Sequence, residues 1–192
     1  MIIISIIITI LFIFWTIAML KGYLCNFDKY IYQKLYINNI LTFGLKIITS
    51  FANTLFLFFI ILLLYLFLDK FMALYFFISL LLNAFINQLL KLVLKRERPN
   101  INRLINERGY SYPSGHTMNA ISFYGLIIYF IIVSPLLIIT KLLLVFLLIL
   151  LIILIGFSRI YLGVHYISDV IGGFLISSGY IIFFIHILQF VL

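Results

Sequence analysis

The sequence predicts an all-α, polytopic membrane protein whose core is a bundle of six transmembrane helices. Of its 192 residues, 66% are hydrophobic and only 9% are charged, which leaves too few polar side chains to cover a soluble domain of this size. The apolar residues form runs of about 20, the length that crosses a hydrocarbon core of about 30 Å. The runs do not alternate as membrane β-strands do, and helices satisfy their own backbone hydrogen bonds in lipid.

Each of the apolar runs is bounded by polar or turn-forming residues. The first run lacks the basic start and the small-residue cleavage site of a signal peptide, so we interpret it as a membrane helix. The third run ends in the polar stretch 95–114, and Pro135 separates the fourth run from the fifth. The predicted spans are Ile2–Leu20, Ile47–Leu68, Phe71–Leu94, Thr117–Val133, Leu136–Phe157 and Val170–Leu192.

A mixed connector, Lys21–Lys46, separates the first two spans, and we expect an interfacial helix in it near Asp28–Tyr36. The sequence shows no internal repeat or low-complexity tract, so we expect 1–192 to form a single membrane-embedded domain. Its one cysteine, Cys25, can form neither an internal disulfide nor a metal cluster. The net charge is +8, but basic residues spread over loops suit anionic lipid headgroups better than nucleic acid.

With six spans, the ends that flank the third and fourth helices and the fifth and sixth helices lie on one membrane face. The first polar cluster on this face is KLVLKRERP, residues 91–99. Lys91 and Arg98 are seven residues apart and would share a face of a continued helix. Pro99 disfavours helical geometry at Arg98, which leaves Lys91 in the last turn. Alternatively, the cations of this cluster simply reach for lipid phosphates; they are Lys91, Lys95, Arg96 and Arg98.

The second cluster is YPSGHT, residues 112–117, directly before the fourth span. Pro113 and Gly115 favour a turn, and Ser114 is a natural N-cap. The free N–H groups and the positive dipole end of the helix that follows would form an anion site, which a glycine lets an anion approach closely. His116 lies at its rim and can exchange a proton near neutral pH. An ordinary capped helix start with an incidental histidine is the alternative.

The third cluster is SRIYLGVHYISD, residues 158–169. His165 and Asp169 are four apart and would be neighbours on a helix. A carboxylate that accepts from one imidazole nitrogen leaves the lone pair of the other nitrogen free to attack. Arg159 carries a planar, permanently charged group that suits phosphate oxygens, and Gly163 permits a bend. A loop with a surface His–Asp pair is the alternative.

Together, the clusters bring three cations, a helix N-terminus, two histidines and one carboxylate to one membrane face. Ionisable groups so close to hydrocarbon are costly and suggest a function. Cations and N–H donors stabilise the spread negative charge of a phosphoryl-transfer transition state. Of the five carboxylates, only Asp169 stands beside a histidine, so we expect no bound metal.

In order and spacing, the three clusters resemble the three-part motif of the type 2 phosphatidic acid phosphatase superfamily. These proteins are membrane lipid phosphatases related to the vanadium haloperoxidases. The resemblance extends from the third span into the sixth, roughly half of the chain, and the six-span layout agrees with it. The residues that carry it are Lys91, Arg98, Pro99, Pro113, Ser114, Gly115, His116, Ser158, Arg159, His165 and Asp169.

The resemblance implies that His165 is the nucleophile and forms a phosphohistidine, that Asp169 orients it, and that His116 is the general acid for the leaving group. It also implies a phosphate-binding set, which consists of Lys91, Arg98, Ser114, Gly115, Ser158 and Arg159. No metal or other cofactor is required in this family.

The implied substrate is a lipid phosphate or diphosphate in the bilayer. The leading candidates are undecaprenyl diphosphate and phosphatidylglycerophosphate, followed by phosphatidate, with a lipid A phosphatase as the alternative. A lipid or anion transporter would not need a His–Asp pair and a second histidine, and the haloperoxidases are soluble. The sequence indicates no oligomeric state. Arg103, Glu107 and Arg108 either select a headgroup or are solvated loop charges, and His186 is predicted to be structural or interfacial.

The composition, rich in Ile, Phe and Lys, suggests a bacterial inner (cytoplasmic) membrane protein, and the family implies an active site on the extracytoplasmic face. The positive-inside rule points the other way. The face opposite the motifs shows only Lys70 and Lys141. We follow the family orientation, because a face that binds phosphate has its own reason to be basic. Besides the catalytic cations, the motif face carries Lys21, Lys29, Lys34, Lys46, Lys95, Arg96, Arg103 and Arg108.

Overall fold

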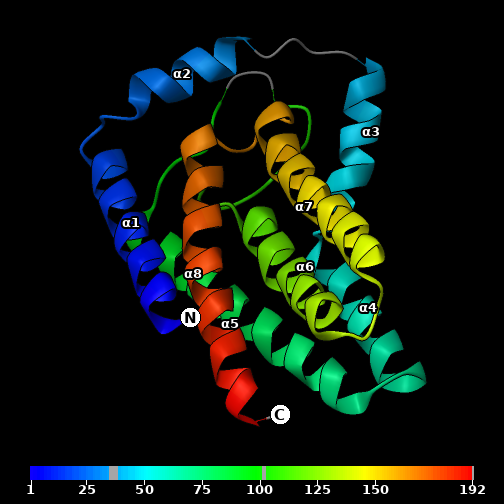
Figure 1. Cartoon of the computed structure of the whole chain (residues 1–192). Coiled ribbons are helices and arrows are strands. Elements are labelled where there is room, and N and C mark those ends of the chain that lie inside the picture. Colours follow the sequence, from blue (N-terminus) through cyan, green and yellow to red (C-terminus); the bar gives the residue numbers. More distant parts are fainter. Residues whose placement is uncertain (35–38, 101–102, 192) are drawn as a thin grey trace.

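The computed structural model describes residues 1–34, 39–100 and 103–191, and this part of the chain is folded into helices (Figure 1). The helices are α1 (Ile2–Leu20), α2 (Cys25–Lys34), α3 (Asn39–Ser50), α4 (Thr54–Phe67), α5 (Lys70–Leu94), α6 (Gly115–Val133), α7 (Ile138–Tyr161) and α8 (Ile167–Val191). Among the described residues, α1, α5, α6, α7 and α8 are each long and apolar enough to cross a membrane, and α3 and α4 together are long and apolar enough to form a sixth, bent span. The prediction of an all-α polytopic membrane protein is confirmed.

The second span differs from the single helix predicted over Ile47–Leu68. Its two helices, α3 and α4, differ in direction by 47°. Asn53 begins the second of them as an N-cap, because its side-chain oxygen accepts a hydrogen bond from the Leu55 N–H at 2.9 Å. Since α3 already begins at Asn39, the end of the predicted connector belongs to this span.

Other helix ends shift so that motif residues lie on helical turns. α7 continues past its predicted end at Phe157 and carries Ser158 and Arg159 in its last turn. α6 and α8 begin a few residues earlier than predicted, at Gly115 and Ile167. The length of an apolar run matches the thickness of the hydrocarbon core. A helix can be longer than the run, because it continues through polar residues as long as its backbone groups find hydrogen-bond partners.

The interior of the bundle lies around α6, which packs against α5, α7 and α8. Its apolar part includes Phe76 and Phe123, whose ring centroids are 4.9 Å apart. Buried polar side chains in this core bond to one another, as interior polar groups must. Asn83 on α5 donates to Asn119 Oδ1 on α6 at 3.0 Å. These contacts hold α5 and α6 in register beneath the motif residues.

The polar loops gather at one end of the bundle. Figure 1 shows α2 lying across this end, with the α5–α6 and α7–α8 loops close beneath it and the C-terminus at the opposite end. Arg98 in the α5–α6 loop donates to the backbone oxygen of Val164 in the α7–α8 loop at 3.0 Å, so the prediction that the two polar stretches share a face is confirmed. α2 overlaps the predicted interfacial helix Asp28–Tyr36, whose residues 35 and 36 lie outside the described residues, as does Leu192 of the predicted sixth span.

Candidate active site

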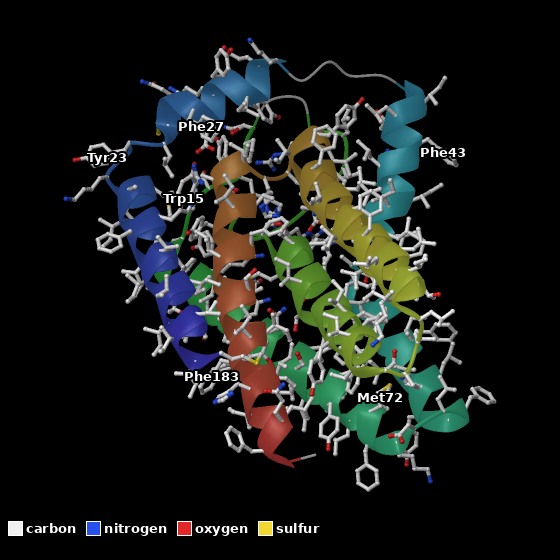
Figure 2. The ribbon with its side chains drawn as sticks, viewed as in Figure 1. Trp15, Tyr23, Phe27, Phe43, Met72 and Phe183 are labelled. Atoms are coloured by element: carbon white, nitrogen blue, oxygen red, sulfur yellow. The ribbon has the colours of Figure 1, made fainter. Side chains whose placement is uncertain are left out.

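The three predicted clusters meet beneath α2. Arg98, from the loop after α5, donates to the backbone oxygen of Val164 at 3.0 Å, and its Nη1 lies 3.3 Å from His165 Nε2. The backbone N–H of His165 donates in turn to the Arg159 oxygen at the end of α7, at 3.2 Å. Side-chain nitrogens are visible between the upper ends of α7 and α8 in Figure 2. The first and third clusters therefore form one site.

His165 lies between a carboxylate and a guanidinium and is only 1% exposed. Its Nδ1 is 3.4 Å from Asp169 Oδ2, while its Nε2 faces Arg98. Gly163, with a φ of +72°, turns the chain between α7 and α8 and brings His165 back toward Arg159. The ring thus has its Nδ1 toward the negative charge and its Nε2 toward the cations, which is where an anionic group would bind.

The charge of His165 follows from this environment. Burial lowers the pKa of His165 well below its ordinary value of 6.5, and the positive charges of Arg159, Arg98 and Lys91 lower this pKa further, against the opposite effect of Glu107. The imidazole is therefore neutral at neutral pH. A neutral imidazole retains the lone pair that a nucleophile needs.

Arg159 is 1% exposed and only partly satisfied. Its Nη1 donates to Thr49 Oγ1 at 3.0 Å and its Nη2 to Glu107 Oε1 at 2.6 Å. Its Nε has no hydrogen-bond partner among the described residues. Buried polar groups normally find a partner, so this N–H can serve a further acceptor such as a phosphate oxygen.

Glu107 lies at the two arginines that were predicted to bind phosphate. Besides its bond to Arg159, its Oε2 is 4.0 Å from Arg98 Nη2. Burial raises the pKa of Glu107, but the charges of Arg159, His116 and Arg98 outweigh it, so the pKa is lowered and the carboxylate stays ionised. Glu107 is therefore more than a solvated loop charge, one of the two interpretations that the sequence left open.

The rest of the α5–α6 loop folds around Arg98. Arg98 donates through Nε to the Gly109 oxygen at 3.0 Å and through Nη2 to the Arg108 oxygen at 3.2 Å. Arg103 donates to the backbone oxygens of Pro99 and Arg98. A pocket of about 550 Å³, with Arg98, Arg103 and Glu107 in its lining, lies over this side of the site. Arg103 therefore stabilises the loop through these hydrogen bonds and also lines the pocket.

The start of α6 differs in detail from the predicted cap. Ser114 occupies the predicted N-cap position, although its hydroxyl accepts from Thr117 Oγ1 at 2.9 Å and caps no backbone N–H. The backbone N–H of Ser114 donates to the backbone oxygen of Asp169 at 3.1 Å, and Asn87 Nδ2 donates to the backbone oxygen of Pro113 at 3.1 Å. The first N–H groups of α6 remain available to an anion.

The close approach of α8 holds this turn in place. A Cβ on Gly172 would lie 2.5 Å from Tyr112 Oη, and a Cβ on Gly173 would lie 3.0 Å from the Ser114 oxygen. Only glycine permits both contacts without a shift of the backbone or of the buried Tyr112. The α8 glycines therefore bring the second cluster against the third.

The remaining predicted residues lie at the same site. His116, in the first turn of α6, is within electrostatic reach of Arg159, Glu107 and His165. Lys91, in the last turn of α5, is within reach of Arg98 and Arg159. Ser158 is buried, and its hydroxyl donates to the Ile155 oxygen at 2.6 Å, so that proton is already used.

Two charged residues that were not predicted to belong to the site lie close to Asp169. Arg96 contacts Asp169 directly, and Asp28 contacts Arg96. Arg96 donates through Nη1 to Asp169 Oδ1 at 2.5 Å and through Nη2 to Asp28 Oδ2 at 2.6 Å. The interpretation of Arg96 as a cation that reaches for lipid phosphates is therefore wrong. No local pattern signals this contact, because 68 residues separate Asp28 from Arg96.

Metal ligands do not gather in the part of the chain that the structure describes: no three His, Cys, Asp or Glu side chains lie together in a way that could hold a metal ion. The charge at the site comes instead from Lys91, Arg98 and Arg159. Their side chains can complement the oxygens of a phosphate group.

Comparison with known proteins identifies the family of the chain. Residues 72–191 match the model of the PAP2 superfamily. Over 101 residues the chain is 39% identical to phosphatidylglycerophosphatase B of Bacillus subtilis (strain 168), an alignment that covers 52% of this chain and 49% of that protein. The chain thus spans about half the length of this curated relative.

Two solved structures share the fold. The first is described as the first transmembrane PAP2 type phosphatidylglycerolphosphate phosphatase from Bacillus subtilis; it matches with a TM-score of 0.89 and 25% identity over 96% of both chains. The second, Aquifex aeolicus LpxE, matches with a TM-score of 0.66 and 25% identity over 86% of this chain and 94% of that one. The family that the three motifs resemble is confirmed, and the chain belongs to the PAP2 superfamily.

Proposed function

We propose that this integral membrane protein is a lipid phosphatase, which hydrolyses a lipid phosphate or diphosphate. The observation that carries the proposal is the setting of His165, with Nδ1 3.4 Å from Asp169 and Nε2 3.3 Å from Arg98. The family match and the phosphatases among the relatives support the class of reaction. We further propose that 1–192 acts as a single catalytic domain, because Asp28 near its start accepts two hydrogen bonds from Ser168 of α8.

In the proposed reaction, His165 Nε2 attacks the phosphorus and displaces the leaving group, which forms a phosphohistidine. Asp169 stabilises the positive charge that develops on the imidazole. His116 donates a proton to the leaving oxygen as that P–O bond breaks. It then takes a proton from a water molecule, whose attack on phosphorus breaks the P–N bond and releases inorganic phosphate.

The phosphate would be held by charges and donors that surround Nε2. Arg98, Arg159 and Lys91 offset the negative charge of the phosphoryl oxygens, and the Gly115 N–H adds a backbone donor at the positive end of the α6 dipole. The Ser114 and Ser158 hydroxyls complete the proposed set, after Ser158 exchanges its present bond to Ile155. These cations supply the charge stabilisation that magnesium supplies in other phosphoryl-transfer enzymes, so the proposal includes no cofactor.

The preferred substrate in this proposal is phosphatidylglycerophosphate, because the curated relative and the first solved structure, both from Bacillus subtilis, are named for that activity. Undecaprenyl diphosphate and phosphatidate are further candidates with the same reacting group. Lipid A is the alternative, and the likeness to LpxE is the reason to include it in the test.

The test is phosphate release by the purified protein in detergent micelles that contain each of the four lipids. We expect release from phosphatidylglycerophosphate that persists in EDTA and is inhibited by vanadate, which mimics phosphate. Activity that disappears in EDTA and returns with magnesium would overturn the metal-independent mechanism. If no lipid yields phosphate, while vesicles that contain the protein move a lipid or an anion, the transporter alternative is correct.

Glu107 should compete with the phosphate group for Arg159. Replacing it by glutamine, Glu107→Gln, removes the negative charge but keeps the shape, so Arg159 becomes more available to an anion. We expect the inhibition constant for vanadate to fall about 3- to 10-fold, which corresponds to roughly 0.7–1.4 kcal/mol. Glu97→Gln, a change to an exposed carboxylate in the same loop, is the matched control and should leave this constant unchanged. An unchanged or higher constant for Glu107→Gln would show that Glu107 does not compete.

We propose that the protein resides in a bacterial cytoplasmic membrane with its active site on the extracytoplasmic face. Cys25 is exposed at the start of α2, at the end of the bundle that holds the site. An impermeant maleimide should therefore label Cys25 in intact cells. In Cys25→Ser/Lys70→Cys, the cysteine lies at the start of α5, at the opposite end, and should react only after permeabilisation. The reverse pattern would place the site in the cytoplasm, as the distribution of basic residues suggests.

A further inference from the structure

Asp28 is a buried carboxylate for which the proposed reaction has no use. It lies on α2, the helix across the end of the bundle, and is 2% exposed. Its Oδ1 accepts from the Ser168 N–H at 3.0 Å, and its Oδ2 accepts from the Ser168 hydroxyl and from Arg96 Nη2, both at 2.6 Å. Burying a carboxylate costs free energy unless the group is paired. Both residues that pair with Asp28 adjoin Asp169: Ser168 precedes it in the chain, and Arg96 donates to its side chain.

Arg96 joins Asp28 to Asp169. Its Nη1 donates to Asp169 Oδ1 at 2.5 Å and to the Ser168 hydroxyl at 2.6 Å, and its guanidinium lies over the Tyr166 ring, 4.5 Å from the centroid. Burial lowers the pKa of Arg96, but the charges and hydrogen bonds of Asp169 and Asp28 raise it by more, so its net shift is upward. The guanidinium is thus a permanently charged bridge between two carboxylates.

This bridge leaves one oxygen of Asp169 for His165. Arg96 holds Oδ1, while Oδ2 accepts from the Tyr166 N–H at 2.9 Å and faces His165 Nδ1 at 3.4 Å. With both oxygens held, the plane of the carboxylate is set, and so is the direction from which it meets the imidazole. An arginine at Oδ1 also helps keep Asp169, which is 0% exposed, in its charged form.

We infer that Arg96 and Asp28 are positioning residues, which act on the nucleophile through Asp169. The inference rests on the proposed function and extends it to helix α2. Asp28 lies outside residues 72–191, the part of the chain that matches the family model. Arg96 and Asp28 are placed to touch the orienting carboxylate rather than the phosphate, so their loss should change turnover more than substrate binding.

The test measures kcat, KM and the midpoint of thermal unfolding for Arg96→Gln, Arg96→Lys, Asp28→Asn and the control Lys95→Gln. Lys95 is an exposed cation next to Arg96, so its variant removes the same charge without touching Asp169. We expect Arg96→Gln to lower kcat about 10- to 100-fold, the size of loss typical when a partner that orients a metal-binding side chain is removed, with KM within about 2-fold. Arg96→Lys should recover part of the loss, Asp28→Asn should lower kcat less, and Lys95→Gln should resemble the wild type.

A second comparison separates positioning from a merely structural role of α2. In an Asp169→Asn background, the carboxylate through which Arg96 acts is already absent, so Arg96→Gln should lower kcat by less than about 3-fold. A full, multiplicative loss in that background would overturn the inference. So would a lower thermal midpoint with an unchanged kcat in Arg96→Gln or Asp28→Asn, because α2 would then only dock on the bundle.

The inference and the proposed function fail in different ways. If the wild-type protein releases no phosphate from any of the four lipids, the proposed function is wrong, and the inference falls with it. If the wild type turns over and the Arg96 and Asp28 variants match it, only the inference is wrong. Should Arg96→Gln fail to fold, Arg96→Lys and the nearly isosteric Asp28→Asn still decide the question, because a lower kcat with an unchanged KM is expected for them too.

Discussion

His165→Ala should lower phosphate release at least about 10³-fold while the protein remains folded and inserted. The alanine removes the imidazole whose Nδ1 lies beside Asp169 and whose Nε2 lies beside Arg98, so no phosphohistidine can form. The loss should appear with every lipid of the panel, because it affects the attack on phosphorus rather than the fit of the lipid. The measurement is the initial rate of phosphate release by purified protein, with thermal unfolding as the check on folding.

The matched control for this variant is His186→Ala. His186 lies late in α8, where it packs edge-on against Phe190 at 5.0 Å, and it should be dispensable for turnover. The wild-type pH profile offers a second check. Because the pKa of His165 lies below 6.5, its imidazole stays neutral and nucleophilic as the pH falls, so the acid limb that reports His165 should lie below pH 6.5. Normal turnover by His165→Ala would refute its role as the nucleophile.

His116→Ala should lower kcat for the lipid substrate about 10²- to 10⁴-fold, the usual contribution of a general acid. Its effect should depend on the leaving group, because a group that departs without a proton does not need His116. With p-nitrophenyl phosphate, whose phenolate is a good leaving group, we expect the formation of the phosphohistidine to be much less impaired. The burst of p-nitrophenolate in rapid-mixing experiments measures this step directly.

The two histidine variants therefore have different signatures. His116→Ala should retain a burst with the activated substrate and then turn over slowly, since water activation also needs this histidine. His165→Ala should give no burst with either substrate. Equal losses on both substrates for His116→Ala would exclude the role of general acid and indicate that His116 only helps to hold the phosphate.

Most of the membrane architecture was predictable because it depends on local composition. The spans Ile2–Leu20 and Phe71–Leu94 match α1 and α5 within a residue, since a run of apolar side chains inserts whatever its neighbours are. The break between α3 and α4 was missed for the same reason. In the sequence, Asn53 is one polar residue inside an apolar run and does not indicate a break. In the structure it caps a new helix at an angle of 47° to the preceding one.

The candidate site was predictable only where the separation of two residues along the chain indicates that they meet. His165 and Asp169 are four apart and do meet, at 3.4 Å. Glu107 and Asp28 belong to no such pattern. Glu107 reaches Arg159 from 52 residues away, and Asp28 reaches Ser168 from 140 residues away, so their partners depend on how the loops and α2 fold over the end of the bundle.

The sequence by itself determined that the chain is a membrane helical bundle and that three motifs, which carry basic residues or a histidine, lie on one face of it. Hydrophobic length and local motif chemistry suffice for this, because each span is stable in lipid through its own backbone hydrogen bonds. Only the tertiary structure decided which buried charge meets which. A buried guanidinium or carboxylate takes the partner that the packing of distant segments brings within about 3 Å, and that distance is not written in the spacing of residues along the chain.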